Sequence, residues 1–221
     1  MSGNSLVTLS RLLLVAGLLS CSRGLTQDCA LSGTVAWSKQ VTSVVSGCDL
    51  KSTSPDGKST VEIDAEGRLH LLEPGRDAKT LPYTIEPPAM LSWSPKSDTF
   101  FINDGQGSGM WSLLRVYRLR TDNVEVDTTV EREAVKLFRG ERKCDTAASE
   151  PSVWGIGWSD NGTLLYLLIQ ATVNEPCGES GAFIGATVNI ATGKIVHHLS
   201  ESQAQHEFRK LLPPELCCDA P

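Results

Sequence analysis

The seven cysteines are the residues whose number and spacing point most directly to chemistry. No two of them have the Cys-x-x-Cys spacing that is typical of thioredoxin-like redox sites and many zinc sites. If Cys21 is removed or acylated during export, an even number remains, which favours disulfide bonds over metal thiolates. Those six are Cys29, Cys48, Cys144, Cys177, Cys217 and Cys218.

Geometry restricts how these cysteines pair. Cys217 and Cys218 are adjacent, so their Cα atoms lie about 3.8 Å apart, less than a disulfide usually spans, and we expect two different partners for them. Cys144 precedes a predicted strand at 153–158, and Cys177 follows its antiparallel neighbour at 163–173. Because the start of the first strand lies beside the end of the second, we predict a Cys144–Cys177 bridge. The other pairings stay open.

The histidines do not form a metal-binding pattern. His197 and His198 are neighbours on a predicted strand, so their side chains point to opposite faces. His206 lies in a predicted helix and has no metal-binding residue four positions later. The sequence therefore predicts no metal site and no cofactor, and it assigns no catalytic residue.

A glycine-rich stretch at 104–109 invites a catalytic interpretation that its details do not support. Gln106 stands where the nucleophile motif G-x-S-x-G needs its first glycine, and phosphate-binding loops join a strand to a helix, whereas this stretch joins two predicted strands. We interpret it as a hairpin loop that binds a partner, because an aromatic beside a loop can anchor an interface. The candidate binding residues are Asp104, Gln106, Ser108 and Trp111.

The N-terminus predicts export. Arg11 precedes an apolar run at 12–19 that is much shorter than the roughly 20 residues needed to span a bilayer, so residues 1–20 read as a signal peptide. The sequence Leu18-Leu19-Ser20-Cys21, at the end of this segment, resembles the lipobox of bacterial lipoproteins, although Leu19 replaces the usual smaller residue. The resemblance implies acylation of Cys21 and membrane anchoring in the bacterial cell envelope. The alternative is cleavage after Ser22 or Gly24 and secretion.

Charge excludes one class of partner. The chain has 20 basic and 26 acidic residues, a formal net charge of −6, and no run of basic residues of the kind that nucleic-acid binding requires. We therefore expect no nucleic-acid partner.

Three stretches share a tight turn followed by strand-forming residues. They contain Ser54-Pro55-Asp56-Gly57, Trp93-Ser94-Pro95-Lys96-Ser97 and Trp158-Ser159-Asp160-Asn161-Gly162. The stretches resemble TolB-type and related WD-like β-propeller repeats, whose usual core is Trp-Ser-Pro-Asp-Gly. The first has Thr53 in place of the tryptophan. The resemblance implies four-stranded blades near 46–81, 89–128 and 153–199, with Trp93 and Trp158 packed between adjacent sheets.

The expected fold is therefore mainly β and β-propeller-like, with three to four four-stranded antiparallel blades, closed or open. Residues 21–45 form an N-terminal tether and irregular segment, with one candidate strand around 35–37, and residues 46–221 form a single domain. Residues 26–45, with Trp37, either supply a fourth imperfect blade or close the last one, and a two-sheet sandwich is the alternative. Helices are expected at 128–140 and at 200–212, the second beginning at Ser200 and ending at Pro213.

Together these features predict a binding or scaffolding protein with a protein partner in the cell envelope and a lipid anchor in the membrane. Two alternatives remain: an accessory subunit of an envelope complex, and a secreted propeller hydrolase.

Overall fold

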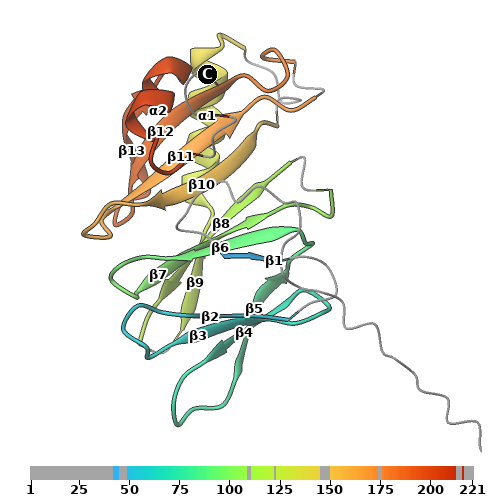
Figure 1. Ribbon diagram of the computed structural model, residues 1–221, viewed down its shortest axis with the longest axis vertical. Helices are drawn as coiled ribbons and strands as arrows, with labels where there is room; N and C mark the ends of the chain where they lie inside the picture. The colour runs from blue at the N-terminus through green and yellow to red at the C-terminus, as the bar shows by residue number, and fades with distance from the viewer. Residues whose placement is uncertain are drawn as a thin grey trace, which may run out of the picture.

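The computed structural model describes residues 42–44, 49–108, 111–121, 123–144, 150–173, 176–212 and 216. These residues form three antiparallel sheets, stacked one on another, and two helices (Figure 1). The expectation of a mainly β fold built from consecutive four-stranded units is thus confirmed.

Within each sheet the strands follow one another in chain order. The first sheet consists of β2 (Leu50–Thr53), β3 (Thr60–Ile63), β4 (Arg68–Leu72) and β5 (Lys79–Thr84). The middle sheet consists of β6 (Ala89–Trp93), β7 (Thr99–Asp104), β8 (Leu113–Leu119) and β9 (Val124–Asp127), with β1 (Thr42–Val44) beside β6. The last sheet consists of β10 (Ser152–Trp158), β11 (Leu164–Gln170), β12 (Phe183–Asn189) and β13 (Lys194–Leu199). Helix α1 (Thr129–Glu141) joins the middle and last sheets, and α2 (Glu201–Glu207) follows β13.

The repeated turn has the same geometry in all three sheets. In each, the serine amide donates to the carbonyl five residues later, and the serine carbonyl accepts from the amide three residues later, over 2.8–3.0 Å. The residue at that third position is left-handed, with φ of 72° at Gly57, 63° at Ser97 and 64° at Gly162. Glycine adopts this conformation without steric cost, which explains why two of the three turns carry it.

The first and middle sheets pack directly against each other. Apolar side chains from both fill the space between them, including Val61, Leu69, Phe100 and Tyr117. Trp93 joins this cluster and is 9% exposed, and its indole N–H donates to the carbonyl of Ser52 over 3.1 Å. The tryptophan therefore packs between sheets, as expected.

The middle and last sheets meet along only part of their width. Strands β7 and β8 contact β10, whereas α1 packs against β8 and all four strands of the last sheet. Trp158, 3% exposed, lies in this second core cluster with its ring centroid 5.6 Å from that of Phe101. Helix α1 thus fills the part of the junction where the two sheets separate.

The two outer faces of the stack differ. On the last sheet, Trp154, Ile156 and Phe183 are buried beneath α2, which begins at a capping box between Ser200 and Gln203. The helix ends at Glu207, earlier than expected, because the chain then turns so that both Phe208 and Leu212 reach the same apolar cluster. The outer face of the first sheet instead carries polar pairs such as Lys51 and Glu62, whose Nζ and Oε2 atoms are 3.2 Å apart.

One strand was not foreseen. Thr42–Val44 pairs with Leu91–Ala89 of β6 and widens the middle sheet, so this part of the N-terminal segment neither starts a fourth sheet nor closes the last one. Three residues are too few to show a strand pattern, and the free edge of β6 decides the pairing. The candidate strand around 35–37, including Trp37, lies outside the described residues.

Candidate functional site

Helix α1 is the element on which the most promising surface is built. Its buried residues Val130, Ala134 and Phe138 recur every four positions, so they form one face that packs into the junction between the middle and last sheets. The opposite face of the helix is left on the outside of the molecule.

The N-terminal end of α1 is held by Asp127. One carboxylate oxygen, Oδ1, accepts a hydrogen bond from the Thr129 amide over 2.8 Å, and the other pairs with the guanidinium of Arg118. Partial burial acts to raise the pKa of Asp127, but the hydrogen bonds from Arg118 and Thr129 outweigh it, and the pKa is lowered. Asp127 therefore stays ionised and fixes the start of the helix.

The C-terminal end of α1 is held by a disulfide. Cys144 is bonded to Cys177, with Cα atoms 5.3 Å apart, so the pairing predicted from the sequence is confirmed. The hairpin register explains it, because Ser152 at the start of β10 lies opposite Gln170 at the end of β11. With both ends fixed to other elements, the helix presents its outer face in one orientation.

Four cations lie on or just beyond that outer face. The spacing of four and three residues places Arg132, Lys136 and Arg139 on the helix surface away from the buried face, and Lys143 follows just beyond the last helical residue, Glu141. We call these four residues the basic stripe.

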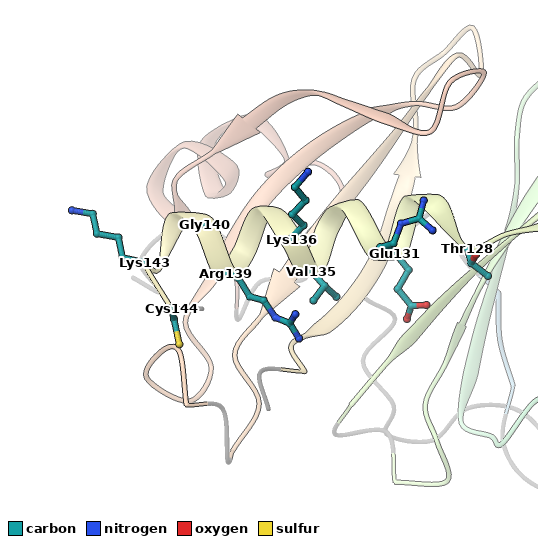
Figure 2. Close-up of a pocket in the computed structure, with 9 residues that line it drawn as sticks. Thr128, Glu131, Val135, Lys136, Arg139, Gly140, Lys143 and Cys144 are labelled. Atoms are coloured by element: carbon teal, nitrogen blue, oxygen red, sulfur yellow. The ribbon is translucent and has the colours of Figure 1, made fainter. Parts of the chain in front are cut away.

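A groove of about 770 Å³ runs along the helix at the stripe. Besides the basic stripe it is lined by Thr128, Glu131, Val135, Gly140 and Cys144. Figure 2 shows Lys136 projecting from one side of the helix and Glu131, Val135 and Arg139 from the other. The volume is in the range of pockets that hold small ligands or peptide segments.

Helix stability does not account for the basic stripe. In the described part of the chain, Arg132, Lys136 and Lys143 form no ion pair. Like charges three or four residues apart destabilise a helix by about 0.2–0.5 kcal/mol per pair. The helix dipole favours Arg139 and Lys143 near the C-terminal end but disfavours Arg132 near the N-terminal end. The stripe therefore has a cost that a bound anion would relieve.

Glu131 marks the N-terminal end of the groove. Burial raises the pKa of its carboxyl, and the charge of Arg115 and a hydrogen bond from the Leu114 amide oppose that rise. Arg115 Nε lies 3.7 Å from the carboxylate of Asp104, so an acidic side chain stands on each side of this guanidinium.

The predicted binding loop begins at Asp104, the residue whose carboxylate lies near Arg115. Asp104 is fully buried, and its Oδ1 accepts from the amides of Glu86 and Gln106 over 3.0 and 3.2 Å, so its carboxylate organises the loop from inside. Gln106 is half-buried, Ser108 is exposed, and the Trp111 side chain is 37% exposed. A binding role for the loop stays a prediction.

The predicted lipidation site and four of the predicted disulfide cysteines lie outside the described residues: Cys21, Cys29, Cys48, Cys217 and Cys218. Among the described residues, no three metal-binding side chains are grouped together. No helix in that part of the chain is both long enough and apolar enough to cross a membrane.

A hydrogen-bonded row on the first sheet looks superficially catalytic. His70 Nε2 lies 3.3 Å from the carboxylate of Asp64, and His70 Nδ1 lies 3.3 Å from the hydroxyl of Thr80. Partial burial acts to raise the pKa of Asp64, but hydrogen bonds from Arg68 and His70 lower it to about 2. The carboxylate is thus shared with Arg68, and the exposed Thr80 lies on an open sheet face, so we interpret the row as polar surface rather than as a nucleophile and its base.

Sequence reasoning missed the basic stripe, although its signal was present. The four cations do not form a continuous run: Arg132, Lys136 and Arg139 are separated by neutral and acidic residues of the predicted helix, and Lys143 follows Arg142. A helical projection of residues 128–140 places Arg132, Lys136 and Arg139 away from the buried face.

No model of a known protein family matches the chain. No significantly similar curated protein is found either.

Proposed function

We propose that this chain is an exported, envelope-anchored binding or scaffolding protein, with its three sheets arranged as an open arc of propeller-type blades. The signal-like residues 1–20 and the lipobox-like residues 18–21 support export and anchoring. The Cys144–Cys177 bridge agrees with folding in an oxidising compartment.

The observation that carries this proposal is the groove along α1. It runs beside a helix whose ends are fixed by Asp127 and by the disulfide, and its lining consists of binding groups rather than a nucleophile with a neighbouring base. A preorganised surface loses little conformational entropy when a partner binds, which favours association.

Photo-crosslinking in intact envelopes tests the proposal. Gly140 lines the groove, and no atom lies within 4 Å of the position that a Cβ would occupy there, so a photoreactive phenylalanine analogue can replace it without a clash. The matched control carries the same analogue in place of Thr80, which is exposed on the outer face of the first sheet.

Irradiation is expected to give a discrete crosslinked species from the Gly140 variant and none from the Thr80 variant. A stoichiometric species would identify the chain as an accessory subunit of a complex. If neither variant gives a discrete species while both accumulate normally, the binding function is wrong.

A further inference from the structure

We infer that the groove along α1 binds a short acidic segment of a partner protein. This inference rests on the proposed function and adds the chemistry of the partner. The basic stripe supplies the first argument, because it places four cations in the lining of one groove, in a chain whose formal net charge is −6. A partner that is merely apolar would desolvate Arg132, Lys136 and Lys143, which form no ion pair in the described part of the chain, and that is costly.

The length of the stripe sets the length of the segment. Arg132 and the last helical residue, Glu141, are nine positions apart, which corresponds to roughly 14 Å along a helix that rises about 1.5 Å per residue, and Lys143 lies just beyond it. An extended chain advances about 3.3 Å per residue, so a segment of roughly five or six residues reaches from one end to the other. Acidic side chains at alternate positions would all point toward the helix.

The residue types favour carboxylates on a peptide chain. A planar guanidinium such as that of Arg132 pairs with a carboxylate through two parallel hydrogen bonds. The half-buried Val135 offers an apolar contact within the same groove. A groove of about 770 Å³ beside a helix accommodates a narrow peptide chain. A flat bilayer surface would instead contact side chains that protrude from the protein.

Glu131 gives the groove a direction. It is the acidic residue of the lining and lies near the N-terminal end of α1, whereas Arg139 and Lys143 lie near the other end. Repulsion between like charges therefore places the most acidic part of the segment toward Lys143 and away from Glu131.

Binding of a labelled peptide tests the inference. The probe is a fluorescein-labelled peptide of alternating glutamate and alanine, and its anisotropy is followed as the purified chain, oxidised and full-length after export, is added. We expect saturable binding that weakens at least about tenfold between low and physiological ionic strength, because the attraction is between exposed charges. A peptide of alternating lysine and alanine should not bind.

Two charge-matched variants locate the site. R132E combined with K136E should weaken peptide binding by at least about tenfold. K58E combined with K79E changes the net charge equally, but on the exposed first sheet, and should leave the affinity within about twofold. Circular dichroism of both variants checks that the fold is retained.

Several outcomes would overturn the inference. They are no binding of the glutamate peptide at low ionic strength, equal loss of affinity in both double variants, and preferential binding to phosphatidylglycerol vesicles, which would make the ligand a lipid surface. The crosslinking experiment separates the two proposals. If R132E/K136E does not diminish the species captured from Gly140, the chain still binds a partner, but not through the basic stripe.

Discussion

The two junctions between neighbouring sheets are built differently, although the same turn and a tryptophan stand beside each. Between the first and middle sheets, apolar side chains meet directly, and one indole hydrogen bond, from Trp93 to Ser52, crosses the boundary. Between the middle and last sheets, contact is confined to the strands nearest β10, and α1 occupies the rest (Figure 1).

Hydrogen bonds also cross the first junction, from Tyr117 to the carbonyl of Pro82 and from the Asp56 amide to Ser97. The second junction adds a helix and a disulfide to such contacts. Asn103 bonds to both the N–H and the C=O of Gly155 over 2.8 Å, Asp127 holds the start of α1, and the Cys144–Cys177 bridge holds its end. This difference explains where the groove lies. A helix inserted between two sheets buries one face and exposes the other. Helix α1 therefore completes the core with its buried face and carries the basic stripe on its exposed face.

The largest expected effect concerns the tryptophan at each junction. W93A and W158A should each lower the free energy of unfolding by about 3–5 kcal/mol, because each removes a buried ring and leaves a cavity between sheets. W111A, at a side chain that is 37% exposed, should cost less than about 1 kcal/mol. Urea denaturation of the three variants measures this, and an unchanged midpoint for W93A or W158A would remove that tryptophan from the core.

The disulfide comes next. Replacing Cys144 and Cys177 together by serine opens a loop with a sequence separation of 33. On the chain-entropy model this lowers the free energy of unfolding by about 3–4 kcal/mol. Helix α1 should also exchange its amide hydrogens faster while strands β2–β5 do not, since the bridge belongs to the second junction only. A loss below about 1 kcal/mol, or equal acceleration in both regions, would contradict this account.

The sequence reveals the repeating unit well because its signals are local. The turn at Asn161-Gly162, the N-cap at Ser200 and the hairpin that brings Cys144 to Cys177 each depend on residues close in the chain. Such features follow from backbone preferences that tertiary contacts do not override.

What the sequence hides depends on tertiary contacts. Trp154 and Trp158 are four residues apart, so strict alternation would place them on one face of β10. The register instead shifts between Gly155 and Gly157, so that Trp154 packs toward α2 and Trp158 toward the middle sheet. A bulge of this kind is set by the packing partner: a Cβ at Gly155 would lie 2.8 Å from the ring of Phe101. The position of α1, and hence the side of it that stays free, is equally a matter of packing.

The side chain of Asn103 links the middle and last sheets through its two hydrogen bonds to Gly155, so substituting it tests that contact. N103A should lower the free energy of unfolding by about 2–4 kcal/mol, because it leaves the buried N–H and C=O of Gly155 without partners. N103D separates the two bonds, since an ionised carboxylate accepts from the N–H but cannot donate to the C=O. Its cost should therefore diminish in mildly acidic buffer, where the buried carboxyl takes up a proton and regains a donor. Denaturation midpoints at two pH values measure both variants, and a pH-independent N103D would contradict the paired geometry.

The smallest expected effect is at Asp127, which starts the helix of the second junction and has no counterpart at the first. D127N should lower the free energy of unfolding by about 1 kcal/mol at neutral pH, because it weakens the pairing with Arg118 and the capping of Thr129. The folded-state pKa of Asp127 is lowered, so its stabilisation is complete above the unfolded-state pKa of about 4 and is lost as the pH falls through the lower folded-state value. The difference between wild type and D127N should therefore be constant near neutrality and disappear in strong acid. Thermal unfolding of both proteins across that range measures it. A difference that persists below the folded-state pKa would mean that the Asp127 charge is not what holds α1 in place.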